Sequence, residues 1–134
     1  RTINSVDYIN DSKGTNAGAT VTAIRSFGAE SFGKVVLIAG GESKDADLTP
    51  LIEPMGVFGK LAILIGADAE KIEQALSDTV EIKKVESLEQ AVHLAQQQAE
   101  AGDVVLLSPA CASFDMFDSY MHRGEVFSKE VAKL

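Results

Sequence analysis

The sequence has few of the features that mark several large classes of protein. Among its 134 residues Cys111 is the only cysteine, so no internal disulfide can form and nothing indicates an oxidising compartment. Twelve Lys and Arg residues stand against twenty Asp and Glu residues, which gives a net charge of −8. This excess of acid argues against nucleic acid or an anionic membrane as the main partner, because both require a basic face.

Long hydrophobic runs and the common cofactor motifs are also missing. The longest apolar stretches, Val35–Gly41 and Leu61–Gly66, are too short to span a bilayer. The phosphate-binding patterns G-x-x-x-x-G-K-[ST] and G-x-G-x-x-G are both absent, and no His/Cys spacing suits zinc, so no metal site is predicted. The chain begins with Arg1 rather than Met, and we expect it to be a piece of a longer protein.

The composition is that of one globular domain covering residues 1–134. Hydrophobic residues make up 46% and charged residues 24%, close to the average for folded proteins. A chain of this size buries roughly two-thirds of its unfolded surface, which is enough for a real core. Short β-rich runs predict strands at five places: Val6–Ile9, Lys34–Ala39, Leu61–Ile65, Val80–Val85 and Val104–Leu107.

Segments between these runs have the apolar spacing of helices. The predicted helices are Ala17–Phe27, a segment between Gly66 and Ser77 whose apolar stripe is Ile72, Ala75 and Leu76, and then Leu88–Ala99 and Arg123–Ala132. Ser87 and Gln90 have the spacing of a capping box at the start of the third. A short helix is expected after the second strand, with loops at Glu30–Gly33 and Pro54–Gly59. This order predicts a doubly wound, mostly parallel α/β sheet, Rossmann-like, with helices on both faces and ligands at the carboxyl ends of the strands.

The loop after the first predicted strand combines charge with a helix start. Asp11 and Lys13 precede Thr15 and Asn16, which are placed at the N-terminus of the first helix. Such an end attracts anions, so Lys13 is a candidate for contact with a phosphate and Asp11 for hydrogen bonds from a ribose diol. The alternative is that Thr15 or Asn16 caps the helix and the charges are solvated.

The loop after the second predicted strand is rich in glycine. Gly40 and Gly41 permit positive φ angles and a close approach of ligand to backbone. Lys44 follows them and would then lie above the edge of the sheet. The alternative is a surface turn in which Lys44 pairs with Asp45 or Asp47.

The loop after the last predicted strand offers small and hydroxyl-bearing residues. Ser113 and nearby N–H groups are candidates for holding a carboxylate. A nucleophilic Cys111 would need a neighbouring base. His93 and His122 are both expected at the surface, so the favoured interpretation of Cys111 is a small buried thiol.

Taken together, four segments resemble the C-terminal domain of the Mur ligases of bacterial peptidoglycan synthesis. They are Tyr8–Asn16, Gly40–Asp47, Leu106–Phe117 and Arg123–Phe127. The first contains Asp-Ser-Lys-Gly-Thr-Asn, which is similar to the Mur ligases that add D-glutamate rather than another amino acid. The resemblance implies a cytoplasmic, ATP-dependent amide ligase of three domains. It activates a substrate carboxylate as an acyl phosphate, which the amine of D-glutamate attacks.

The resemblance also implies a division of labour between domains. Asp11 and Lys13 match positions that reach the ribose and phosphates of ATP. The P-loop, the Mg²⁺ ligands and the site for UDP-N-acetylmuramoyl-L-alanine belong to the N-terminal and central domains, which this sequence lacks. The chain alone is therefore expected to be inactive and to bind its ligands weakly.

D-glutamate is the partner that the resemblance assigns to this domain. Thr15 and Lys44 match positions that hold carboxylate groups of D-glutamate. Ser113 and the backbone around Phe114 match the site of the other carboxylate. Tyr120 matches an aromatic residue that lines this site. Charge-assisted hydrogen bonds at such a site contribute about 1.5–3 kcal/mol each. Since the domain carries a net charge of −8, attraction for a diacid has to be local.

Two further positions and two alternative functions complete the predictions. Glu42 lies where the resemblance implies Asp in some relatives, and no role is assigned to it. Asp47 is expected to be a structural residue rather than a ligand contact. A signalling receiver domain would fit the length and acidity, but it needs an Asp at the end of the third strand and a Lys at the end of the fifth. The third strand ends in Ile65-Gly66-Ala67, and the fifth runs into Ser108-Pro109 without a Lys. A ligand-free interaction module is the other alternative. A monomer is expected.

Overall fold

The protein, described here by a computed structural model for residues 1–113 and 116–134, has a single mixed sheet. The strands of the described residues are β1 (Thr2–Ile3), β2 (Val6–Asn10), β3 (Val35–Gly40), β4 (Gly59–Ile65), β5 (Glu81–Lys84) and β6 (Val104–Leu107). Their order is β1-β2-β6-β3-β4-β5, and β1 pairs antiparallel with β2 while the other pairs are parallel. The predicted mostly parallel α/β sheet is confirmed.

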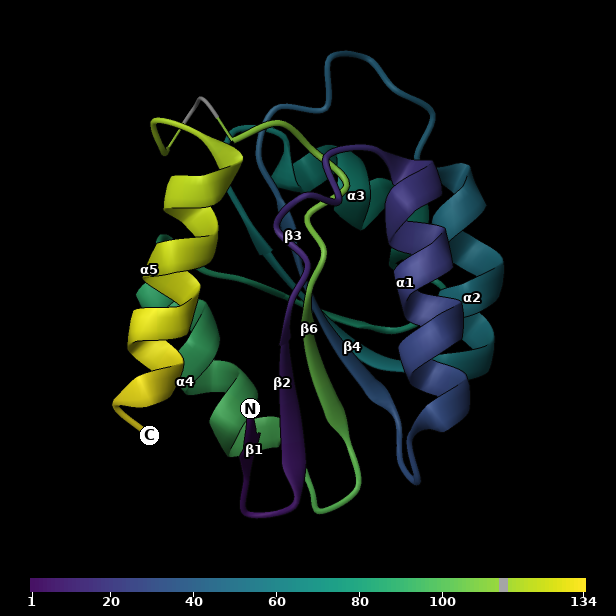
Figure 1. The fold of residues 1–134 in the computed structure, drawn as a ribbon. Coiled ribbons are helices and arrows are strands. Elements are labelled where there is room, and N and C mark those ends of the chain that lie inside the picture. The colour runs from purple at the N-terminus through teal and green to yellow at the C-terminus, as the bar shows by residue number, and fades with distance from the viewer. Residues whose placement is uncertain (114–115) are drawn as a thin grey trace.

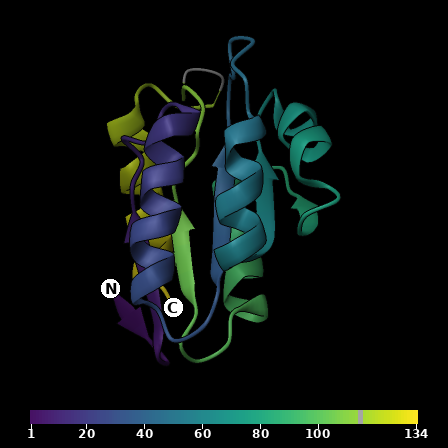
Figure 2. The same cartoon turned by 90° about the vertical axis from the view of Figure 1, so that its right-hand side faces the viewer.

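Helices cover both faces of this sheet (Figures 1 and 2). They are α1 (Ala17–Glu30), the 3₁₀ turn η1 (Thr49–Leu51), α2 (Ile52–Phe58), α3 (Ala69–Leu76), α4 (Leu88–Gln98) and α5 (Tyr120–Ala132). Buried side chains of α1, α2 and α3 join one hydrophobic cluster, and those of α4 and α5 join a second on the opposite face. Among the described residues no helix has the length and apolar character needed to cross a membrane.

Strand β3 shows why its sequence reads as an unbroken apolar run. All its residues are buried, and successive side chains point to opposite faces of the sheet. Leu37 and Ala39 therefore join the cluster beneath α1, α2 and α3, whereas Val36 and Ile38 join the cluster beneath α4 and α5. A strand covered on both faces needs apolar residues at every position.

The prediction was wrong at two places and missed one short strand. Pro54–Gly59 was predicted to be a loop, but α2 begins at Ile52, and Pro54 lies in its first turn, where a missing N–H costs no helical hydrogen bond. Helix α5 begins at Tyr120 rather than Arg123, because the side chain of Ser119 caps it by accepting from the N–H of His122. The two-residue strand β1 was not predicted. The predicted Ser87 cap of α4 is confirmed, since Ser87 accepts from the N–H of Gln90.

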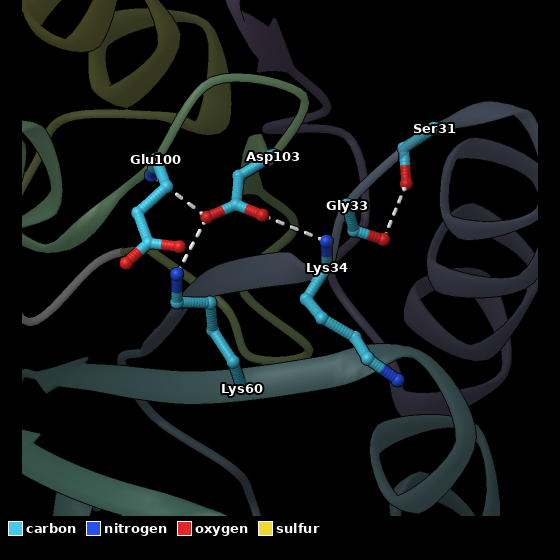
Figure 3. A network of polar contacts seen from close by, with 6 residues as sticks. All are labelled: Ser31, Gly33, Lys34, Lys60, Glu100 and Asp103. Carbon is cyan, nitrogen blue, oxygen red and sulfur yellow. Dashed lines mark hydrogen bonds and ion pairs between the residues drawn. The ribbon is translucent and has the colours of Figure 1, made fainter.

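Asp103 ties together the amino-terminal edge of the sheet (Figure 3). Its carboxylate is buried and accepts hydrogen bonds from the N–H groups of Lys34 and Glu100 at 2.8 Å each and from the ammonium of Lys60 at 2.6 Å. Burial alone would raise the pKa of Asp103. The two N–H donors and the Lys60 ammonium outweigh burial and hold this pKa below its usual value.

The opposite, carboxyl edge carries the loops that sequence analysis singled out. In the sheet β6 lies between β2 and β3. Leu107, the last residue of β6, pairs with Asn10, the last residue of β2, and with Ile38, two residues before the end of β3. The loops that follow these three strands therefore meet above the centre of the sheet, at the top of Figure 1. Ligands of open α/β sheets bind at such an edge.

Candidate functional site

A cavity of about 440 Å³ opens where the three loops meet, and four of the predicted D-glutamate residues line it. They are Thr15 from the first loop, Lys44 from the second, Ser113 from the third and Tyr120 at the start of α5. Ser113 is buried, Thr15 and Tyr120 are half-buried, and Lys44 is exposed. The fifth predicted residue, Phe114, lies outside the described residues.

Lys44 has an uncommon backbone conformation. Its φ is +52° and that of Asp45 is +59°, so two consecutive non-glycine residues are left-handed. Strain of this kind costs about 1–3 kcal/mol per residue and is concentrated at functional sites. The alternative in which Lys44 pairs with Asp45 or Asp47 is not observed, because Asp45 pairs with Lys71 and Asp47 accepts from Thr49. Within the described part of the chain no carboxylate pairs with the Lys44 ammonium.

Asp68, which sequence analysis missed, fixes the loop that carries Lys44. Its carboxylate accepts from the backbone N–H of Ser43 at 2.7 Å and from the Ser43 hydroxyl at 3.0 Å, and its own N–H donates to the carbonyl of Gly41. The Ser43 N–H and hydroxyl hold the pKa of Asp68 below its usual value. Asp68 occupies the N-cap position of α3 but makes no capping bond there, and no sequence signal distinguishes this use from an ordinary cap.

Two glycines allow the second and third loops to touch. Gly40 and Gly41 have φ angles of +133° and +130°, as their positions in the sequence predicted. Gly41 approaches the third loop closely, because a Cβ on it would lie 2.1 Å from the carbonyl oxygen of Ala112. Here Glu42 and Ala112 form a two-bond antiparallel bridge, with each N–H 3.0 Å from the partner's carbonyl oxygen.

Arg123, in α5, connects the first and third loops through its buried side chain. It is 1% exposed, and its guanidinium donates to the hydroxyl and the carbonyl of Ser12 at 3.0 and 2.9 Å and to the carbonyl of Cys111 at 3.1 Å. The planar fork of Arg is suited to several acceptors in fixed directions. Sequence analysis included Arg123 in a matching segment but assigned it no role.

Asp11 and Lys13 line two cavities, of about 640 and 410 Å³, that border the first loop. The Asp11 carboxylate accepts a hydrogen bond from the hydroxyl of Ser108 at 2.8 Å, and Lys13 is exposed. Asn16 caps α1 through its side chain, which accepts from the N–H of Ala19. The cap therefore does not use Thr15, which lines the cavity shared with Lys44 and Ser113.

The remaining candidates for chemistry are unremarkable in the structure. Cys111 is buried, as predicted for a small packed thiol. His93 is exposed on α4, whereas His122 is half-buried within α5 and accepts from the N–H of Asp118. Among the described residues no group of three or more His, Cys, Asp or Glu side chains is arranged to hold a metal ion.

Comparison with known proteins identifies the family of the chain. The family model described as "Mur ligase, glutamate ligase domain" matches residues 1–111. A protein of Marinobacter nauticus named UDP-N-acetylmuramoylalanine--D-glutamate ligase is 58% identical over 95% of this chain and 28% of its own length. Proteins of the same name from Legionella pneumophila and Coxiella burnetii are 52% and 51% identical over all of this chain and 30% of theirs. The chain thus spans less than a third of these relatives.

Solved structures support the fold. The MurF ligase from Thermotoga maritima in complex with ADP has a TM-score of 0.64 at 21% identity, over 99% of this chain and 30% of that one. FolC of E. coli in complex with ADP has a TM-score of 0.61 at 21% identity, over 90% and 28%. Since the family model spans most of the sequence, this chain belongs to the family of the Mur ligase, glutamate ligase domain.

Proposed function

We propose that this chain is the amino-acid-binding domain of a bacterial cytoplasmic ligase that joins D-glutamate to UDP-N-acetylmuramoyl-L-alanine at the expense of ATP. The observation that carries the proposal is the single cavity lined by Thr15, Lys44 and Ser113. The names of the relatives at 51–58% identity support the choice of amino acid. Activation of the UDP-linked substrate is assigned to the part of the longer ligase outside this chain.

D-glutamate matches the chemistry of the cavity. It carries two carboxylates, and the cavity offers the Lys44 ammonium and the hydroxyls of Thr15 and Ser113 on different loops. Lys44 is the only cation among the described lining residues, so it provides the local attraction that a domain of net charge −8 otherwise lacks. Tyr120 also lines the cavity. With both carboxylates held, the amine is left to attack the activated carboxyl group, and the contribution of this domain is positioning.

ATP fits the first loop in part. The Lys13 ammonium is exposed for a phosphate, and Asp11 lines both cavities beside it with a carboxylate that can accept from a ribose diol. ATP would supply the phosphoryl group that activates the acyl substrate. The described residues offer no cluster of ligands for Mg²⁺, so the metal is assigned to the rest of the ligase.

Titration of the ¹⁵N-labelled chain with D-glutamate tests the proposal. Thr15, Lys44 and Ser113 are expected to shift together, and L-glutamate serves as the stereochemical control. Lys44→Ala should weaken binding about ten- to hundredfold, the loss of one charge-assisted hydrogen bond. Lys83→Ala, which removes an exposed lysine of β5, should leave it unchanged. Absence of shifts at these three residues would overturn the proposal.

A second measurement addresses catalysis and the alternatives. The chain alone is expected to show no ATP hydrolysis and no ligase activity, because half of the reaction site lies outside it. Turnover by the isolated chain would contradict the proposed division. Incubation with acetyl phosphate should leave no phosphorylated product, whereas a receiver domain would accept the phosphoryl group. The receiver and ligand-free alternatives are not favoured by the family match.

A further inference from the structure

Beneath the first loop, a buried hydroxyl group contacts the Asp11 carboxylate, and a second buried hydroxyl group contacts the first. Ser108, directly after β6, and Thr20, in α1, are both 0% exposed. The Ser108 hydroxyl donates to Oδ2 of Asp11 at 2.8 Å. The hydroxyl oxygens of Thr20 and Ser108 lie 3.0 Å apart, and the Thr20 hydroxyl donates to the carbonyl oxygen of Ser108 at 3.1 Å. Three segments that are distant in sequence are thereby joined at one carboxylate.

Two of the hydrogen bonds that hold Ser108 in place use its backbone and not its hydroxyl. The bond from Thr20 reaches the backbone carbonyl of Ser108, so it would persist with any residue at position 108. The N–H of Ser108 donates to the carbonyl of Ile38, which is also independent of the side chain. What the hydroxyl adds is a charge-assisted hydrogen bond to Asp11, and such bonds are shorter and more directional than neutral ones.

Asp11 itself is half-buried and borders both cavities beside the first loop. Its Oδ2 is engaged by Ser108, and within the described residues no protein group bonds to Oδ1. A carboxylate held at one oxygen has a fixed orientation and presents its other oxygen to a ligand. An unheld carboxylate loses side-chain entropy when a ligand orders it, and that loss weakens binding.

We propose that Ser108, supported by Thr20, is a positioning residue that orients the Asp11 carboxylate toward a ligand hydroxyl group. The inference rests on the proposed function, in which that hydroxyl belongs to the ribose of the nucleotide. Ser108 does not touch the nucleotide in this account, and it acts through Asp11. The Thr20 hydroxyl holds the backbone of Ser108 in the position from which the Ser108 hydroxyl contacts the Asp11 carboxylate.

The first test needs no ligand. Three-bond Hα–Hβ couplings of Asp11 report whether its side chain occupies one rotamer. A single rotamer is expected in the parent chain and averaging over several in Ser108→Ala. Ser31→Ala is the matched control, because it removes a hydroxyl that contacts two backbone carbonyls at the opposite edge of the sheet. A single Asp11 rotamer retained in Ser108→Ala would overturn the proposal.

The second test uses the longer ligase that carries this domain. Dissociation constants are measured for ATP, 2′-deoxyATP and 3′-deoxyATP. The parent should prefer ATP, and Asp11→Asn should abolish the preference. Ser108→Ala should weaken ATP binding about fivefold and reduce the preference for ATP over the deoxynucleotides by the same factor. The affinity for the deoxynucleotides should change little. Ser108→Cys should restore part of the loss, since its thiol is a weak donor.

The outcomes separate the two proposals. If Asp11→Asn abolishes the preference for ATP but Ser108→Ala retains it in full, the positioning role is wrong and the nucleotide role of Asp11 stands. If neither variant changes the preference, the nucleotide role of Asp11 falls and the positioning role falls with it. D-glutamate binding at the cavity of Thr15, Lys44 and Ser113 is measured separately and does not depend on either result.

Discussion

Glu42 and Ala112, from loops that follow different strands, exchange both of their backbone hydrogen bonds at 3.0 Å. Lys44 lies two residues beyond Glu42, and Ser113 is the residue after Ala112. The bridge therefore fixes the backbones of the two loops that bring Lys44 and Ser113 to the same cavity. A contact between two main chains does this without depending on the side chains of Glu42 or Ala112.

Gly41→Ala should break this bridge. The added Cβ would lie 2.1 Å from the carbonyl oxygen of Ala112, and φ at Gly41 is +130°, which L-residues rarely adopt. We expect the free energy of unfolding to fall by about 1–3 kcal/mol and D-glutamate binding to be lost. Urea unfolding and NMR titration measure the two effects.

The matched control for this substitution is Gly56→Ala. Gly56 lies inside α2, where an added Cβ finds only ordinary contact with Thr79 at 3.6 Å. Alanine favours helix by about 1 kcal/mol over glycine, so this variant should be at least as stable as the parent and bind D-glutamate normally. Equal behaviour of the two variants would contradict the structural importance of the bridge.

Lys44→Gly should raise stability while removing ligand binding. Glycine adopts the φ of +52° without strain, which is worth about 1 kcal/mol, but the ammonium is lost. Asp45→Gly relieves similar strain in the neighbouring residue and leaves the ammonium in place, at the cost of an exposed ion pair with Lys71. Thermal unfolding should therefore shift upward in both variants, whereas D-glutamate binding should survive only in Asp45→Gly. Intact binding in Lys44→Gly would remove Lys44 from the site.

Arg123→Lys should separate the first loop from the third. A lysine keeps the charge but cannot donate in the directions of Ser12 and Cys111 at once. We expect a loss of about 3 kcal/mol in the free energy of unfolding and amide shift changes in both loops. Arg25→Lys is the control, because Arg25 forms an exposed pair with Glu53, and such pairs contribute about 0–1 kcal/mol. Unchanged amide shifts in both loops of Arg123→Lys would show that Arg123 does not connect the first loop to the third.

Asp103 should make stability depend on pH in the acid range. Its pKa in the folded protein is below the usual value, so the unfolded chain binds the proton more readily. Stability from this group is therefore complete above the unfolded pKa of about 3.9 and is lost as the pH falls below it through the folded pKa. Asp103→Asn should reduce stability at neutral pH and flatten this part of the profile. Asp78→Asn, at an exposed position, should leave the profile unchanged.

Periodicity in the sequence was sufficient to predict the sheet and most of the helices. Strands such as β3 and β6 are buried on both faces, so their apolar runs carry the signal directly. The wrong boundaries have local causes. Pro54 suggested a loop, although proline is compatible with the first turn of a helix, and β1 is too short to have a period.

The parts of the site that could not be predicted depend on contacts between distant segments. Lys44 and Ser113 were singled out, and the structure places both in one cavity. Arg123 was not assigned a role because an arginine in a helical pattern normally faces solvent, and its burial results from acceptors on two loops. Asp68 and Ser108 were missed for the same reason, since Asp and Ser at the ends of elements are usually read as caps or turns.

The framework of this edge and the side chains proposed to bind D-glutamate are different sets of atoms. Main-chain bridges and the buried Arg123 and Asp68 hold the loops, whereas the exposed Lys44 makes none of the hydrogen bonds that anchor them. A gene duplicate can therefore exchange the lysine for another side chain without dismantling its scaffold. Such an arrangement lets one architecture acquire new amino-acid preferences through few mutational steps, each of which leaves a folded intermediate.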